Sequence, residues 1–108
     1  MNWTYEQKIA VLKTLFFIAG ADGNINDKEI SYFSQYANLM NLPIPQAQQE
    51  ADQLNNLSVA HIIRNMAKED RDYIMKLWIG LVKCDGNVND REIEMIADIA
   101  LDCNVNLP

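Results

Sequence analysis

Several kinds of residue are scarce in this chain, and their scarcity excludes whole classes of site. Of its 108 residues, two are cysteine and one is histidine. Cys84 and Cys103 are too few and too far apart for a disulfide framework or a thiol redox motif. Free cysteines are usually small buried residues, and their presence favours a reducing compartment. The single histidine, His61, has no serine or cysteine placed to form a catalytic triad with it, so we expect a surface or core role.

Long apolar runs are missing as well. The longest apolar stretch covers residues 9–21, is interrupted by Lys13 and Thr14, and is too short to span a bilayer. The first residues lack the basic region and the apolar run of a signal peptide. We therefore expect no membrane span and a cytoplasmic location.

A nine-residue acidic segment occurs twice. Asp22-Gly-Asn-Ile-Asn-Asp-Lys-Glu-Ile30 returns as Asp85-Gly-Asn-Val-Asn-Asp-Arg-Glu-Ile93, with two conservative differences. Charges and apolar positions on both sides keep the offset of 63 residues between Asp22 and Asp85. The sequence predicts one domain, 1–108, with repeat 1 at about 3–43, a connector at 44–65 and repeat 2 at about 66–106. Each repeat is a helix-loop-helix unit, and we expect pseudo-twofold symmetry between them.

The acidic excess is concentrated in these repeated segments. The chain holds 15 acidic and nine Lys or Arg residues, for a formal net charge of −6. Each segment carries three carboxylates against one basic side chain. Nucleic acid binding needs clustered Lys and Arg, so the chain is not expected to bind it. Cations or basic protein surfaces are better partners.

Hydrophobic spacing predicts an all-α fold of about six helices, because no stretch alternates with the period of a strand. Thr4 and Gln7 form a capping box for a first helix that is apolar on nearly all sides, as expected of a central buried helix. Its counterpart around 74–82 has the same character and should pack against it. Trp3 and Trp78 are predicted to lie in the core.

The expected helix ends follow from turn and cap residues. The two Asp-Gly pairs should stop the central helices, with left-handed glycine, and Asn26 and Asn89 should restart the chain as N-caps. A third helix should have Pro45 in its first turn, and a short fourth should follow Ser58. The predicted inner faces of the later helices are Ile30, Phe33, Ala37 and Met40; Ile93, Ile96, Ala100 and Cys103; Ala47, Ala51, Leu54 and Leu57; and Val59, Ile62, Ile63 and Met66.

The loops share only fragments of a calcium-binding EF-hand. Its opening pattern fits Asp22-x-Asn24-x-Asn26, and its closing half fits the stretch that ends in Glu29. The two fits use different registers. In the first, the closing glutamate position falls on Phe33; in the second, the first ligand positions fall inside the apolar helix. A loop of that type needs about six oxygens, and one loop here supplies roughly half.

Three interpretations of the loops stay open. Helix capping explains nearly every residue except the aspartates that begin each segment. If symmetry brings the loops together, their carboxylates could share a divalent cation; otherwise they could form a protein-docking surface. The six carboxylates in question are Asp22, Asp27, Glu29, Asp85, Asp90 and Glu92.

No enzyme is expected. The chain has no Gly-rich phosphate loop, no zinc-ligand spacing and no pair of carboxylates in an obvious apolar pocket. A small hydrolase that uses the loop carboxylates and a metal is the only enzymatic alternative that the residues allow.

The two segments also resemble a known family. Ala19-Gly-Ala-Asp-Gly-Asn-Ile-Asn-Asp-Lys-Glu-Ile30 and Lys83-Cys-Asp-Gly-Asn-Val-Asn-Asp-Arg-Glu-Ile93 are similar to the alanine-rich helix, Asp-Gly turn and downstream glutamate of TerB-like tellurite-resistance domains. This domain type also occurs at the N-terminus of some membrane-anchored J-domain co-chaperones. The resemblance implies a cytoplasmic, all-helical domain of stress resistance, with acidic positions that bind metal and no catalytic activity. Carried over to this sequence, the candidate metal ligands are Asp22, Glu29, Asp85 and Glu92, with Asp27 and Asp90 as supporting charge. Tellurite is itself an anion, so any resistance role would be indirect.

Overall fold

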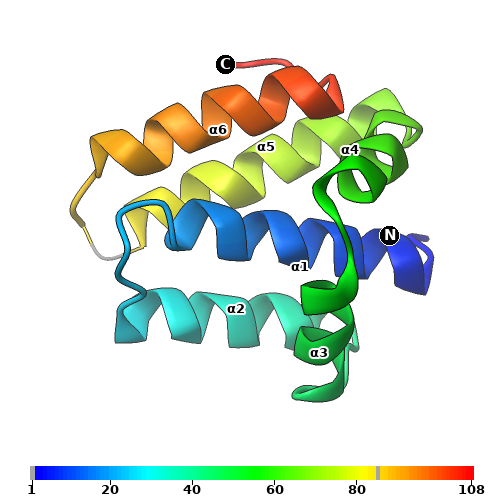
Figure 1. The fold of residues 1–108 in the computed structure, drawn as a ribbon, viewed down its shortest axis with the longest axis horizontal. Coiled ribbons are helices and arrows are strands. Elements are labelled where there is room, and N and C mark those ends of the chain that lie inside the picture. Colours follow the sequence, from blue (N-terminus) through cyan, green and yellow to red (C-terminus); the bar gives the residue numbers. More distant parts are fainter. Residues whose placement is uncertain (1, 85) are drawn as a thin grey trace.

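All regular structure in the described part of the chain is helical. The computed structural model describes residues 2–84 and 86–108. The helices within these residues are α1 (Tyr5–Ala19), α2 (Asp27–Leu39), α3 (Gln46–Gln53), α4 (Asn56–Arg64), α5 (Lys68–Lys83) and α6 (Asp90–Cys103) (Figure 1). The predicted all-α class is confirmed. In the same residues, no helix has the length and apolar character needed to cross a membrane.

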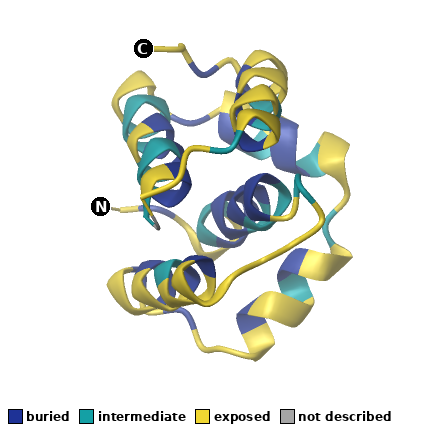
Figure 2. Ribbon diagram, turned by 90° about the vertical axis from the view of Figure 1, so that its left-hand side faces the viewer, coloured by how far each residue is buried: buried dark blue, intermediate teal, exposed yellow. Residues whose placement is uncertain are grey.

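Helix α1 forms the centre of the molecule. It contacts each of the other five helices, and a view roughly along its axis shows it enclosed by them (Figure 2). This arrangement follows from a helix whose side chains are apolar on nearly every face. Truncation of one such core leucine to alanine typically costs about 2–5 kcal/mol. The buried residues of α1 are Ile9, Ala10, Val11, Leu12, Thr14, Leu15, Ile18 and Ala19.

A polar pair lies inside this apolar centre. The Trp78 indole Nε1 on α5 donates a 2.8 Å hydrogen bond to Thr14 Oγ1, and both side chains are fully buried. The Thr14 hydroxyl in turn donates to the Val11 carbonyl at 2.6 Å. Buried polar groups are costly unless they are paired, and here each has a partner. The pair therefore fixes how α1 and α5 lie against each other. Trp3 is buried too, as predicted.

The predicted N-terminal caps form as expected at α1 and α2. Thr4 Oγ1 accepts from the Gln7 amide at 3.1 Å, and Gln7 Oε1 accepts from the Thr4 amide at 2.9 Å. Asn26 and Glu29 make the same reciprocal pair. At α6, Asn89 Oδ1 accepts from the Arg91 amide at 2.9 Å and from the next amide at 3.3 Å.

Asp22, Gly23 and Gly86 lie beyond the helix ends, contrary to the prediction that the Asp-Gly pairs stop the helices; Asp85 lies outside the described residues. Helix α1 already ends at Ala19, and Gly23 closes a following turn by donating to the Gly20 carbonyl at 3.0 Å. Gly86 donates to the Lys83 carbonyl at 3.1 Å in the same way. Both glycines have the predicted positive φ, 84° and 80°. The two glycines therefore shape turns in the loops instead of ending the helices.

Two starting points in the connector were predicted wrongly. Pro45 is the N-cap of α3 rather than a residue of its first turn. Helix α4 begins at Asn56, because the Asn55 side chain accepts from the Ser58 amide at 2.8 Å and so caps the helix three residues before Ser58. Leu57 consequently lies on the outer side of α4 and is 85% exposed, not buried as predicted.

The inner faces of α2 and α6 are narrower than predicted. Ile30 is 51% exposed and Ile93 is 46% exposed, although both were expected in the core. The pattern cannot distinguish them from core positions, since their burial depends on whether another helix covers them. The predicted residues that are buried on these helices are Phe33, Ala37, Met40, Ile96, Ala100 and Cys103.

Equivalent positions of the two repeats share local backbone features. Asn41 and Asn104 follow α2 and α6 with φ of 57° and 56°. The amide of Leu42 bonds the Ala37 carbonyl at 2.8 Å, and at the same offset Val105 bonds the Ala100 carbonyl at 2.9 Å. The overall twofold relation of the halves stays a prediction.

Two tyrosine hydroxyls attach α2 to its neighbours. Tyr36 Oη donates to the Lys8 carbonyl of α1 at 2.8 Å, and Tyr32 Oη donates to the Leu77 carbonyl of α5 at 2.8 Å. Burial raises the pKa of Tyr32 to about 12. Burial raises the pKa of Tyr36 well above its ordinary value as well.

We expect Tyr32→Phe and Tyr36→Phe each to lower the free energy of unfolding at pH 7 by about 0.5–1.5 kcal/mol, the usual net contribution of one hydrogen bond. The folded protein holds both protons more tightly than the unfolded chain. The contribution of each tyrosine to the free energy of unfolding should therefore be fully present below pH 10. It should fall as the pH rises above 10, and for Tyr32 the fall should end near pH 12. Urea unfolding at pH 7 and pH 11 measures this, and each phenylalanine variant should lose less stability at high pH than the parent. An equal alkaline loss in parent and variants contradicts the assignment.

Candidate functional site

The two acidic loops lie at the same end of the molecule. The loop between α1 and α2 and the loop between α5 and α6 both extend beyond the left-hand ends of their helices (Figure 1). A hydrogen bond joins them: Asn89 Nδ2 donates to Asp22 Oδ2 at 3.2 Å. These residues are 67 positions apart in sequence, so the fold brings the two copies of the acidic segment together.

A hollow of about 200 Å³ lies between the loops. Of the predicted metal ligands, Asp22, Glu29 and Glu92 line it. Asp27 and Asp90, the first residues of α2 and α6, are exposed and are not among its lining residues. Asp85, the remaining candidate, lies outside the described residues. The other lining residues are Asn26, Asn87, Val88 and Asn89.

The side-chain oxygens of the first loop already accept hydrogen bonds from the backbone. Asp22 Oδ1 accepts from the Asn24 amide at 2.9 Å, and Glu29 Oε1 accepts from the Asn26 amide at 3.0 Å. The Asn26 side chain accepts from the Glu29 amide at 2.9 Å. These bonds hold the loop in shape and complete the N-terminal turn of α2. Capping therefore accounts for a large part of the local chemistry.

Two glutamates of the site are buried. Glu29 is 3% exposed and Glu92 is 5% exposed. A carboxylate rarely becomes this buried unless it is hydrogen-bonded. Both follow their N-cap asparagine by three positions, where a glutamate can reach back to the start of its helix. Their positions thus depend on the helix starts, and both residues line the hollow between the loops.

No cluster of three or more Asp, Glu, His or Cys side chains in residues 2–84 and 86–108 is close enough to hold a metal ion. The hollow offers carboxylate and amide oxygens, the ligand types that hard cations such as Ca²⁺ and Mg²⁺ take. The donor set therefore fits a hard divalent cation in kind, while the described carboxylates do not form a compact ligand group.

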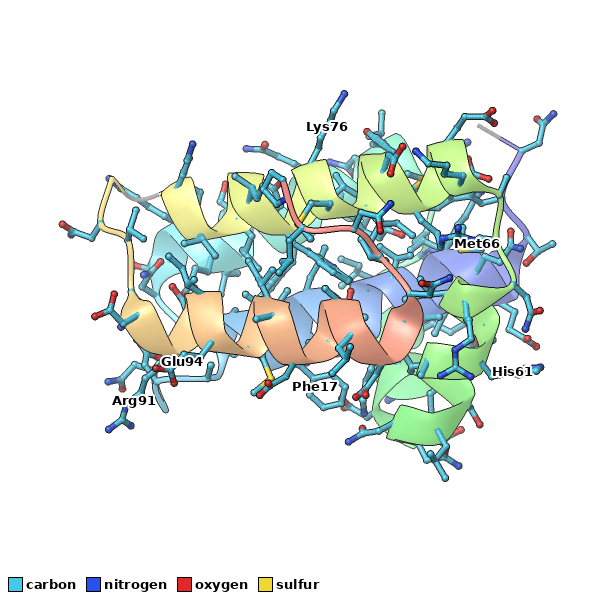
Figure 3. All side chains as sticks on the ribbon, turned by 90° about the horizontal axis from the view of Figure 1, so that it is seen from above. Phe17, His61, Met66, Lys76, Arg91 and Glu94 are labelled. Carbon is cyan, nitrogen blue, oxygen red and sulfur yellow. The ribbon has the colours of Figure 1, made fainter. Side chains whose placement is uncertain are left out.

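The charged side chains around the loops are of mixed sign. Arg91 and Glu94 project at the loop end of α6, whereas His61 lies on α4 at the opposite end (Figure 3). His61 is exposed, and its ring nitrogen Nδ1 lies 3.4 Å from the side-chain nitrogen Nδ2 of Asn65. This agrees with the surface role among the two predicted for it. Its position separates the histidine from both acidic loops.

Comparison of the chain with known protein families, with curated proteins and with solved structures finds no match. The resemblance to TerB-like domains therefore stays a prediction from the two acidic segments.

Sequence reasoning missed two surface grooves. The α2 groove has a volume of about 460 Å³ and is lined by Leu12, Phe16, Ile25, Ile30, Phe33, Ser34, Ile44, Gln48 and Asp52. The α6 groove has a volume of about 280 Å³ and is lined by Met75, Ile79, Val82, Lys83, Val88, Ile93, Ile96, Ala97, Leu107 and Pro108. Seven residues that line the α2 groove have a counterpart 63 positions later that lines the α6 groove; the first such pair is Leu12 and Met75, and the last is Ile44 and Leu107. One sequence feature could have indicated the grooves: both acidic loops keep an apolar residue at the same position, Ile25 in the first and Val88 in the second.

We expect Asn89→Asp to lower the free energy of unfolding by about 1–3 kcal/mol, because the aspartate keeps the cap but cannot donate to Asp22. Two carboxylates would then face each other at hydrogen-bond distance. Urea unfolding at pH 7 measures the change, and added salt should reduce it.

Asn55→Asp is the matched control, since Asn55 caps α4 through the Ser58 amide. An aspartate at this N-cap should change stability by no more than about 0.5 kcal/mol. Equal effects at Asn55 and Asn89 would show that the bond between the loops contributes nothing.

Proposed function

We propose that this chain is a non-enzymatic TerB-like domain, associated with stress or tellurite resistance, whose duplicated acidic loops bind a divalent cation or a basic partner surface. The observation that carries the proposal is the Asn89–Asp22 hydrogen bond, which holds the two loops against each other. Loops on opposite sides of the molecule could not pool their carboxylates. Here they contribute to one hollow.

The cation arm of the proposal is supported by the chemistry of that hollow. Asp22, Glu29 and Glu92 line it together with amide side chains. Hard divalent cations take about six to eight such oxygens. The proposed ligand set adds Asp85, the counterpart of Asp22, while Asp27 and Asp90 contribute negative charge nearby. A bound cation would offset the repulsion among these groups.

The basic-partner arm is supported by exposure. Asp27 and Asp90 occupy the first turns of α2 and α6, are exposed, and can face a partner without displacing cap bonds. The formal net charge of −6 adds a long-range attraction for cationic surfaces.

The alternative is a protein–protein interaction module in which the acidic loops are only helix caps. The cap hydrogen bonds of Asn26, Glu29 and Asn89 favour this alternative, because they use the same side chains that a ligand would need.

Thermal unfolding and calorimetry with Ca²⁺, Mg²⁺, Mn²⁺ and Zn²⁺ test the cation arm. A cation that binds only the folded state should raise the free energy of unfolding by about 2.7 kcal/mol at a hundredfold excess over its Kd. Asp22→Asn combined with Asp85→Asn should abolish the increase. Asp98→Asn combined with Asp102→Asn removes the same charge from the middle and end of α6 and should preserve it.

A short oligolysine peptide tests the basic-partner arm in the same variants. Binding that the loop variant loses and the α6 variant keeps supports this arm. If the loop substitutions change neither ion binding nor oligolysine binding, the proposal is wrong and the loops act as caps alone.

A further inference from the structure

The α2 groove exposes an apolar surface that the fold does not cover. Ile25, Ile30 and Ile44 are 46%, 51% and 48% exposed around it, and Leu12 and Phe33 form a buried floor. Its volume of about 460 Å³ is within the range of roughly 300–1,000 Å³ typical of binding pockets. Clustered, exposed aliphatic side chains of this kind mark an interaction surface.

One charged side chain is among the residues that line this groove, and it is acidic. Asp52 of α3 lines it, and no lysine or arginine does. Asp27 lies three residues before Ile30 on α2, hence on the same helix face. A basic group lies beside the groove, because Lys13 Nζ donates to the Asp52 backbone carbonyl at 3.3 Å. The α6 groove differs, because Lys83 is part of its lining.

Charge decides among the possible occupants. A second copy of this chain carries the same net charge of −6, and nucleic acids and anionic membranes are negative as well. Each would bring like charge to an acidic rim. A partner with apolar anchors and basic flanks matches both the floor and the rim.

We propose that the α2 groove binds an amphipathic helical segment of a partner protein, with apolar side chains on one face and Lys or Arg beside them. The described residues present no strand edge to which a peptide could add. A helix placed in a groove, with anchors at i, i+3 or i+4 and i+7, is the recognition mode that remains for an apolar groove between helices. The groove adjoins the first acidic loop, because Ile25 and Ile30 belong to the segment 22–30, but the proposed function of the loops does not use its apolar floor of Leu12 and Phe33.

The test uses a synthetic helical peptide with leucine at i, i+3 and i+7 and lysine on the flanking positions. Calorimetry measures its Kd, and amide chemical shifts locate it. We expect the largest shifts at Ile25, Ile30 and Ile44. Replacing the peptide lysines with glutamate should abolish binding, and added salt should weaken it.

Ile30→Gln should weaken binding about tenfold, which corresponds to roughly 1.4 kcal/mol. Ile93→Gln is the matched control: it changes an equivalent, equally exposed residue of the α6 groove and should change the Kd less than about twofold. Asp52→Asn should weaken binding less than Ile30→Gln and reduce its salt dependence. Circular dichroism and melting temperatures establish that each variant folds.

Several outcomes overturn the inference. The α2 groove is not the binding site if Ile30→Gln and Ile93→Gln weaken peptide binding equally. The basic flanks are irrelevant if the glutamate peptide binds as tightly as the lysine peptide. Self-association or binding to anionic vesicles that Ile30→Gln abolishes would assign the groove to another occupant. If Asp22→Asn combined with Asp85→Asn abolishes peptide binding and Ile30→Gln does not, the peptide binds at the acidic loops and not in the α2 groove. That result would favour the proposed function instead.

Discussion

The enclosure of α1 is the constraint on which the rest of the structure depends. A helix that is apolar on nearly every face is stable only when other elements cover all of it, and α1 contacts all five other helices. The Thr14–Trp78 hydrogen bond inside this core adds direction to an otherwise non-directional packing, because a misplaced α5 would leave an indole N–H unpaired. The positions of both acidic loops follow, since each loop leaves the end of a helix in this central pair.

Features that depend on a few neighbouring residues could be predicted from the sequence. The capping box of Thr4 and the cap of Asn26 involve partners three residues away, and the backbone geometry of a helix start brings them together. The burial of α1 was equally predictable from its composition. Ile30, Ile93 and Leu57 were misplaced because helical spacing says which side chains share a face, not whether another helix covers that face. Ser58 was misjudged because Asn55 makes the cap first.

The candidate site depends partly on neighbouring residues in the sequence and partly on how the two halves of the chain pack. Its residues could be identified from the repeated segment, and the caps around Glu29 are local. The contact between Asp22 and Asn89 could only be anticipated through an assumed symmetry, since it joins residues from opposite halves of the chain. The two grooves were missed for the same reason: their walls combine two or three helices and a loop, and sequence spacing describes each wall separately.

The packing of α6 against α1 has a consequence for synthesis on the ribosome. Helix α1 remains partly uncovered until α6 has been translated, because α4, α5 and α6 all pack against it. During that interval, the nascent chain exposes apolar side chains of α1 that are buried in the folded protein. Apolar surface that is exposed transiently makes a folding chain prone to aggregate, and this exposure ends only when α6 has packed against α1.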